Sequence, residues 1–501
     1  MTGMKTDSVA NGGVTIILAR VIGMGCAFLL FVLLARQSDI QAGVFRAAVT
    51  FMVISEFIGL LGTQRWLVVA IAPEGPNRWQ LFLAGSALAV MTAVLIALVY
   101  LGISFSGVYG EDISHGLLLV ALATLPAALL TNVQTTLVGI GLSQRMGLLN
   151  LLENVVRSVV SIACVLYGLS VLSVIVVFVV CRWLVTLFGL VMVFRQLKGS
   201  GWWPQSGLLH RLIRQVPRFA LIMVAFLLIR NAALVLLPAL VDEREVALFA
   251  VPYQLYDLAL LVPTILAISS NFLFVTCAER GNGALRWVVT QLWSLTSVFL
   301  LPLVMLSLVF GPDLLHTVFG QRYDASVPAL YLLMLATPLM ALDQVLSQTM
   351  QSTKRFREDA ISMLFGASAV LLGTIVLGGV WGATGAALTL LVTLVLILFV
   401  RFVQLRTLIS AGFMFRLVWR PVVATVLVGV LCWLVRNFIL QSSPFLLAWG
   451  WLPVSLAAVP TYLLVLQRLG GLKTSKRGRV RQFLLSRHVA NPIDLVEDKY
   501  E

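Results

Sequence analysis

Charged residues are scarce in this chain: only 11% of its 501 residues are Asp, Glu, Lys or Arg, while 60% are hydrophobic. A water-soluble domain carries about 25% charged residues, because its surface must be solvated. The mean hydropathy of +1.00 agrees with this contrast. The composition therefore excludes a soluble enzyme, a disordered chain and a small disulfide-stapled protein. The apolar runs are continuous, which also excludes a barrel of alternating apolar and polar strands.

Cysteine and histidine are few and isolated. The five cysteines form no CxxC or metal-type spacing, and the four histidines fall in expected loops or the tail. No nucleophile–base constellation and no Gly-rich phosphate loop occurs, so we expect no catalytic residues, no metal site, no cofactor and no direct use of ATP. A cleavable signal peptide is not expected either, because the first apolar run is long enough to be retained as a span.

Long apolar stretches are what this sequence has instead. A helix needs ~20 mostly apolar residues to cross a bilayer core. The sequence predicts an all-α polytopic membrane protein with about 14 transmembrane helices. The stretches are 13–35, 44–72, 80–105, 115–141, 148–169, 171–195, 218–241, 246–275, 284–310, 327–350, 358–378, 381–402, 416–438 and 445–467.

Basic residues gather at alternate connections between these stretches. Placing the N-terminus in the cytoplasm puts most Lys and Arg inside, and puts the acidic segments 111–112 and 242–245 outside. Both termini are then cytoplasmic, and the net charge of +14 reflects topology and needs no nucleic acid. The basic tail is expected to contact anionic membrane lipids.

An internal repeat divides the chain. Leu122–Leu129 (LATLPAAL) and Leu335–Leu342 (LATPLMAL) stand at corresponding places in the two halves, which predicts two pseudo-symmetric six-helix lobes plus two extra C-terminal helices. Substrates of such duplicated transporters lie between the lobes. The expected regions are an N-terminal lobe (1–195), a linker with an interfacial amphipathic helix (196–217), a C-terminal lobe (218–402), the extra spans (403–467) and a basic cytoplasmic tail (468–501).

Each arginine inside an apolar stretch raises the free energy of membrane insertion by ~2.5–3.5 kcal/mol, so such arginines usually face a cavity or a partner. Arg182 and Arg230 lie near mid-depth and are candidates to bind a substrate. Arg20 and Arg65 are candidates too, but from their depth they could equally snorkel to the headgroups.

Acidic residues inside the apolar stretches can either couple transport to an ion gradient or form ion pairs with arginines. Glu56 and Asp257 are candidates for coupling to a proton or sodium gradient, with permanent ion pairs to Arg20 or Arg230 as the alternative. Glu153 and Arg157 are expected to pair as i,i+4 neighbours. Asp343 is expected to cap its helix or to pair with Lys354 or Arg355.

Tyr253, Gln254 and Asp257 share one helical face and would suit sugar hydroxyls by stacking and hydrogen bonding. The same face could equally pack between helices with its polar groups satisfied there.

Several ordered motifs resemble one transporter superfamily. They are Gly311–Leu315 (GPDLL) followed by Phe319–Tyr323 (FGQRY), and Trp381–Ala387 (WGATGAA). The chain resembles the multidrug/oligosaccharidyl-lipid/polysaccharide (MOP) exporter superfamily, specifically its polysaccharide flippase branch of the O-antigen or Wzx type. The Arg- and Asn-rich pattern of the related lipid II flippases is not seen after the second stretch.

This resemblance implies a bacterial inner-membrane flippase. It would translocate undecaprenyl-diphosphate-linked oligosaccharide for surface or exopolysaccharide synthesis by alternating access, alongside polysaccharide polymerase and export machinery. An ion-coupled multidrug or organic-cation exporter of the same superfamily is the first alternative. A membrane polysaccharide polymerase or ligase is the second, although the short outside loops offer it no catalytic carboxylate cluster.

Overall fold

The computed structural model describes residues 6–72, 77–197, 203, 206–409, 411–438 and 449–470. Within these ranges the chain forms helices joined by turns and contains no strand, which confirms the expected all-α class. The helices are α1 (Thr6–Gln37), α2 (Asp39–Ile58), α3 (Gln64–Ile71), α4 (Asn77–Phe105), α5 (Glu111–Gly139), α6 (Ser143–Leu166), α7 (Val171–Gln196), α8 (Ser206–Leu240), α9 (Glu243–Ala259), α10 (Leu261–Glu279), α11 (Asn282–Leu314), η1 (Leu315–Phe319), η2 (Gln321–Ser326), α12 (Val327–Ser352), α13 (Phe356–Gly373), η3 (Thr374–Gly378), α14 (Gly379–Gln404), α15 (Ala411–Phe438) and α17 (Trp451–Arg468).

Eleven helical stretches in the described ranges are long and apolar enough to cross a membrane, so the chain is a multi-pass membrane protein. A helix satisfies its own backbone hydrogen bonds, which is why apolar runs of this length become helices in lipid. One stretch, Phe356–Gln404, covers two expected spans. The first and last expected spans coincide with α1 and α17. The total of about 14 stays a prediction.

The stretch 356–404 is a helical hairpin. Its two ends lie together, because the Arg355 guanidinium donates to the Gln404 carbonyl (3.1 Å) and Ser362 donates to the Gln404 side chain (2.8 Å). The helical conformation breaks at Gly382, where φ is +52°. Glycine adopts this conformation without a Cβ penalty. The Glu245 carboxylate accepts the Ala383 N–H (3.0 Å) and so caps the second arm.

Two compact units divide the described helices, and they differ from the expected lobes. Unit 1 is Met1–Val251 with the hairpin tip Ala367–Ala386, and unit 2 is Pro252–Gly366 with Ala387–Glu501. Unit 1 extends beyond the expected boundary at residue 195 because α8 packs on α2 and α4, and η3 packs on α8. The duplicated lobes, the linker and the extra spans stay predictions. The tail beyond residue 470 lies outside the described residues.

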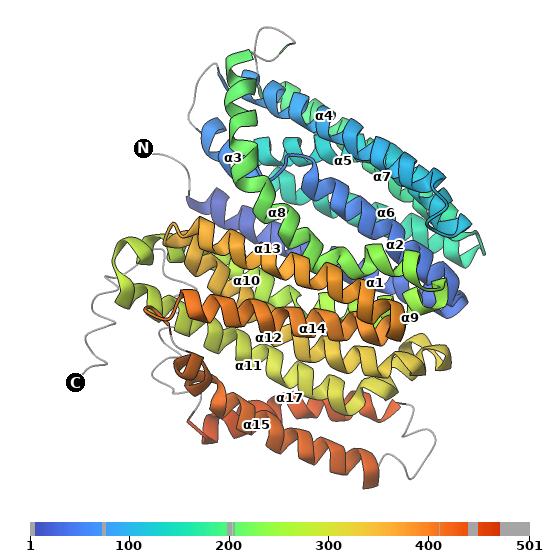
Figure 1. Ribbon diagram of the computed structural model, residues 1–501, viewed down its shortest axis with the longest axis vertical. Coiled ribbons are helices and arrows are strands. Elements are labelled where there is room, and N and C mark those ends of the chain that lie inside the picture. Colours follow the sequence, from blue (N-terminus) through green and yellow to red (C-terminus); the bar gives the residue numbers. More distant parts are fainter. Residues whose placement is uncertain are drawn as a thin grey trace. The chain divides into compact units, whose positions relative to one another are not determined.

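Within unit 1, α5 is central: it packs against α2, α3, α4 and α7, and α6 packs against both α1 and α7 (Figure 1). Within unit 2, α11 packs against α10, α12, α15 and α17. Side-chain ion pairs bring together polar groups of α2, α6 and α7 in unit 1, and those of α12, α13 and α14 in unit 2.

The amphipathic segment expected in the linker is the first part of α8, which runs unbroken into the next span. Leu212 is fully buried, and Leu208, Leu209 and Val216 pack with it against a cluster that includes Leu60. His210, Arg211 and Arg214 face outward, on the side opposite this cluster. The expected apolar face therefore exists and is covered by unit 1. Residues 198–202 and 204–205 of the linker lie outside the described residues.

Candidate functional site

Arg182 on α7 is the centre of an ion network in unit 1. Its Nη2 lies 3.1 Å from Glu56 Oε2 on α2, and its Nε lies 2.9 Å from Glu153 Oε1 on α6. One guanidinium thus joins three helices. Glu56 was expected to pair with Arg20 or Arg230 if it paired at all, and the partner that the structure gives it is Arg182.

The two carboxylates of this network differ in exposure. The Glu153 side chain is 5% exposed and that of Arg182 is 11% exposed, whereas Glu56 is 38% exposed. Glu153 is therefore the buried partner of Arg182, whereas Glu56 lies at the exposed edge of the network. A guanidinium presents several N–H donors in a planar fork, which suits binding of carboxylate or phosphate oxygens.

Arg157 completes the network on α6. Its Nη1 lies 3.6 Å from Glu153 Oε1, which confirms the expected i,i+4 pair. Its Nη2 donates to Asn154 (2.7 Å), and its guanidinium carbon lies 4.4 Å from the centroid of the Phe178 ring. With two arginines and two glutamates, the network is balanced in charge.

The structure describes fewer contacts for the other arginines that we expected to bind substrate. Arg230 lies on α8, is half-buried, and has its guanidinium carbon 5.9 Å from the Phe226 ring centroid. The side chains of Arg20 and Arg65 lie outside the described residues, although both positions are in helices, α1 and α3. Their roles stay predictions.

The expected sugar-binding face on α9 is largely covered. Tyr253 is 2% exposed and Gln254 is 7% exposed, and the Tyr253 and Tyr256 rings stack at a tilt with centroids 5.3 Å apart. Asp257 is half-buried. This burial matches the alternative in which the face packs between helices. A sugar would reach Tyr253 and Gln254 only after a rearrangement.

A second ion cluster, in unit 2, was missed from the sequence. Arg401 on α14 is fully buried, with its Nε 2.6 Å from Asp343 on α12 and its Nη1 2.8 Å from Asp359 on α13. The expected pairing of Asp343 with Lys354 or Arg355 is therefore wrong. Arg401 lies at the end of an apolar run, a position that is typical of an arginine in a cytoplasmic loop. The signal that could have revealed the cluster is the pair Asp359 and Arg401, because each lies about one turn inside the end of its helix, α13 or α14, and these helices are adjacent.

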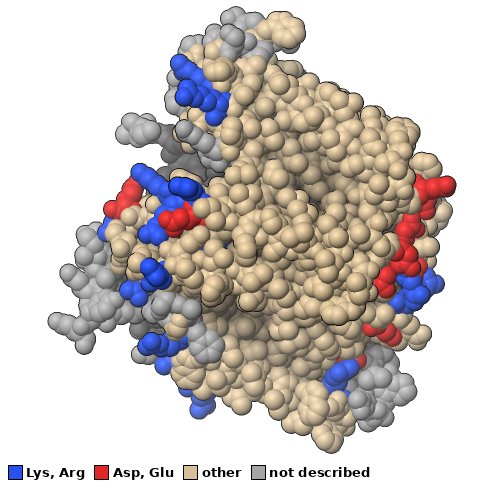
Figure 2. All heavy atoms as spheres, in the orientation of Figure 1, with Lys and Arg blue, Asp and Glu red and all other residues tan. Residues whose placement is uncertain are grey.

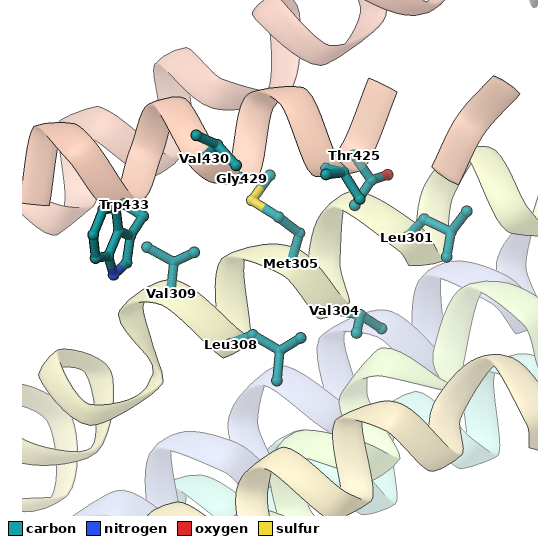
Figure 3. Close-up of a pocket in the computed structure, with 10 residues that line it drawn as sticks. Leu301, Val304, Met305, Leu308, Val309, Thr425, Gly429, Val430 and Trp433 are labelled. Carbon is teal, nitrogen blue, oxygen red and sulfur yellow. The ribbon is translucent and has the colours of Figure 1, made fainter. Parts of the chain in front are cut away.

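An apolar groove lies in unit 2 between α11 and α15, with a volume of about 320 Å³. In Figure 3 Met305 on α11 points toward Gly429 on α15, where a Cβ would collide with the Met305 side chain. The groove is also lined by Leu301, Val304, Leu308, Val309, Thr425, Val426, Val430 and Trp433.

The GPDLL motif anchors α15 at one end of this groove. Asp313, at the end of α11, accepts a hydrogen bond from Arg436 Nη2 of α15 (3.2 Å), and its other oxygen lies 2.7 Å from Arg436 Nε as an ion pair. A hydrogen bond between two charged groups is stronger than one between neutral groups. The acidic residue of the motif thus holds α15 against α11.

Solved membrane transporters share this fold. The lipid II flippase MurJ in an inward closed conformation matches with a TM-score of 0.71 over 93% of this chain and 100% of that chain, at 11% identity. An inward-facing MATE multidrug resistance transporter of the MOP superfamily matches with a TM-score of 0.63 over 81% and 95%, at 14% identity. A MOP superfamily transporter from Pyrococcus furiosus matches with a TM-score of 0.56 over 80% and 95%, at 14% identity. The chain therefore has the fold of these solved transporters.

A family model then narrows this class. The model for polysaccharide biosynthesis proteins matches residues 38–328, more than half of the chain, so the protein belongs to the polysaccharide biosynthesis family. The match includes the GPDLL and FGQRY motifs, and the resemblance inferred from their order is confirmed. No curated protein matches the chain.

Proposed function

We propose that this protein is a flippase that moves an undecaprenyl-diphosphate-linked oligosaccharide from the cytoplasmic to the periplasmic leaflet of a bacterial inner membrane. The observation that carries the proposal is Arg182, a buried guanidinium whose second carboxylate partner, Glu56, is exposed enough to be exchanged. Membership of the polysaccharide biosynthesis family supports the substrate class.

The chemistry of the headgroup fits this exchange. A diphosphate that leaves water needs cationic, fork-shaped donors, and it competes with a carboxylate for the same N–H groups. When a phosphate oxygen replaces Glu56 at Arg182, the freed carboxylate either gains water or takes up a cation. Glu56 is thereby our candidate for coupling to a proton or sodium gradient, and Asp257 is a second one. Arg20, Arg65 and Arg230 would supply further cationic contacts.

The membrane potential favours the proposed direction. With the cell interior negative, each negative charge moved outward gains ~2.3 kcal/mol per 100 mV. A dianionic headgroup is therefore driven outward even before any ion is coupled. Sugar hydroxyls would contact Tyr253 and Gln254 once α9 rearranges.

The proposed orientation rests on the charge pattern along the chain. Basic residues gather at alternate connections between the apolar stretches, and the positive-inside rule places these connections and both termini in the cytoplasm. Broad parts of the surface in Figure 2 carry almost no Lys, Arg, Asp or Glu, which suits helices that face lipid. Anionic lipids would contact the cytoplasmic side, and a polysaccharide polymerase and export machinery would receive the product on the periplasmic side.

The experiment that tests this function is translocation of a fluorescent undecaprenyl-diphosphate oligosaccharide in proteoliposomes with an imposed potential. We expect outward movement that rises with an inside-negative potential and falls at least several-fold in Arg230→Ala and Arg20→Ala. Arg420→Ala is the matched control, because this guanidinium donates to the Gly470 carbonyl near the helix ends (2.9 Å). Efflux of small organic cations without movement of the lipid-linked sugar would assign the chain to the drug exporters instead.

The apolar groove between α11 and α15 gives a second prediction. Its lining suits a hydrocarbon chain, so the polyprenyl tail is expected to rest there while the headgroup crosses. Val430→Trp would fill the groove and slow translocation several-fold. Leu427→Trp is the control, since Leu427 is equally exposed on α15, at 54% against 53%, and does not line the groove. Equal rates in the two variants would exclude the groove as the tail site.

A further inference from the structure

The two ion clusters differ in their charge balance. In unit 1 two arginines meet two glutamates, and the more exposed glutamate has access to water. In unit 2, Asp343 and Asp359 share a single guanidinium, that of Arg401. The side chains of Arg401 and Asp359 are 0% exposed and that of Asp343 is 4% exposed. If both acids were ionised, this cluster would hold one uncompensated negative charge away from water.

The surroundings of the cluster offer little to offset that charge. The charged groups that act on Asp343 are Arg401 on α14 and Asp359 on α13. Helices α10 and α11 also pack on α12, and they contribute apolar side chains, among them Phe274, Leu292 and the weakly acidic Cys277, to the core that includes Leu342 and Leu346. An isolated carboxylate in such a core neutralises itself by binding a proton.

The hydrogen bonds decide which acid stays ionised. Asp359 accepts hydrogen bonds from the Ser347 hydroxyl (2.9 Å) and the Gln351 amide (3.0 Å), and it also forms an ion pair with Arg401 (2.8 Å). Asp343 meets Arg401 alone, at 2.6 Å. Because donors stabilise the ionised form of a carboxylate, the charge belongs on Asp359. We propose that Asp343 carries a proton at neutral pH and that the Asp343–Arg401–Asp359 cluster is a proton-binding site in unit 2.

A proton fits this site better than a metal cation does. The Arg401 guanidinium already fills the space between the two carboxylates and would repel a second cation. The Ser347 hydroxyl and the Gln351 amide both donate hydrogen bonds to Asp359, so neither presents a carbonyl or carboxylate oxygen to a metal there. Dry carboxylate pairs that cannot both ionise hold one proton between them in other proteins too.

The site also has the means to exchange its proton. Gln351 is half-buried and donates to Asp359 and Ser347, so the cluster lies only one side chain away from the surface of unit 2. Arg401 Nη2 has no hydrogen-bond partner in the described part of the chain. This donor remains available for the second charge that appears on Asp343 when the proton leaves.

Infrared spectroscopy of the purified protein tests the proposal directly, because the carbonyl stretch of a protonated carboxylic acid lies apart from the carboxylate bands. We expect such a band at neutral pH in the unchanged protein and its loss in Asp343→Asn. Asp359→Asn should also remove the band, since Asp343 then becomes the sole acid beside Arg401 and ionises. Glu56→Gln, in the balanced cluster, should leave the band in place. Persistence of the band in Asp343→Asn, or in a folded Asp359→Asn variant, would overturn the proposal.

A role for this proton in transport rests on the proposed flippase function. In the proteoliposome assay, Asp343→Asn should move the lipid-linked sugar at a rate that responds less to an imposed pH gradient than that of the unchanged protein, since Glu56 and Asp257 remain. The infrared result does not depend on substrate. If the unchanged protein moves no lipid-linked sugar, the flippase function fails while the proton site stands. If the band is absent, the site fails whatever the protein transports.

Discussion

Arg401→Met is expected to be the most destabilising single substitution in unit 2, with a loss of about 3–5 kcal/mol in the free energy of unfolding. Removing the only cation of a buried ion cluster strands its anion, and here the ionised Asp359 would remain beside Asp343, both with almost no exposure. The change is measured by tryptophan fluorescence during SDS titration in mixed micelles, since the chain carries 12 tryptophans.

The matched control also replaces the two acidic groups that lose their partner when Arg401 is removed. A triple variant that combines Arg401→Met with Asp343→Asn and Asp359→Asn leaves no ionised group in the cluster, and neutral replacement of a buried ion cluster is often tolerated. It should recover most of the lost stability. A single variant that is as stable as the unchanged protein would contradict the buried cluster that the structure describes.

The helices themselves could be predicted because one physical requirement dominates them. A backbone in lipid must satisfy its own hydrogen bonds, so each apolar run of sufficient length becomes a helix. The pair of Glu153 and Arg157 was predictable for a similarly local reason, since residues four apart share a helix face. In both cases the information lies within one helix.

Contacts between helices were not predictable in the same way. The sequence predicted that Asp343 pairs with Lys354 or Arg355, the cations nearest to it in the chain. Its partner is Arg401, which lies on α14, the second arm of the hairpin 356–404. Glu56 was assigned to Arg20 or Arg230, and its partner is Arg182 on α7. A single sequence gives the depth of each charge but not the rotation of its helix, and rotation decides which charges meet.

The same limitation applies to the sugar-binding face. Tyr253, Gln254 and Asp257 share a face by spacing, but spacing does not say whether that face is open. The nearly complete burial of Tyr253 and Gln254 depends on neighbouring helices that pack over α9. The GPDLL motif was recognised from the sequence, but its structural role was not. The structure shows that its Asp313 forms an ion pair with Arg436 of α15.

Arg182→Met is expected to reduce translocation of the lipid-linked oligosaccharide at least tenfold while the protein stays folded. A charge-assisted hydrogen bond of ~1.5–3 kcal/mol to Glu56 and an ion pair with Glu153 meet at this guanidinium, and the proposed headgroup would use the same donors. The loss of stability should be smaller than for Arg401→Met. Glu153 keeps Arg157 as a partner, and Glu56 is 38% exposed, so water can solvate the carboxylate that remains unpaired.

A double variant separates a role in folding from a role in transport. Adding Glu56→Gln to Arg182→Met leaves Arg157 paired with Glu153, so the network is again balanced and any lost stability should return. Translocation should stay low, because no guanidinium remains at that point to receive a diphosphate. Recovery of transport in the double variant would mean that Arg182 only compensates Glu56, and the anion site would then have to be sought at Arg230. Arg182→Lys completes the series: it keeps the charge but loses the fork that reaches two carboxylates at once, so translocation should remain well below that of the unchanged protein.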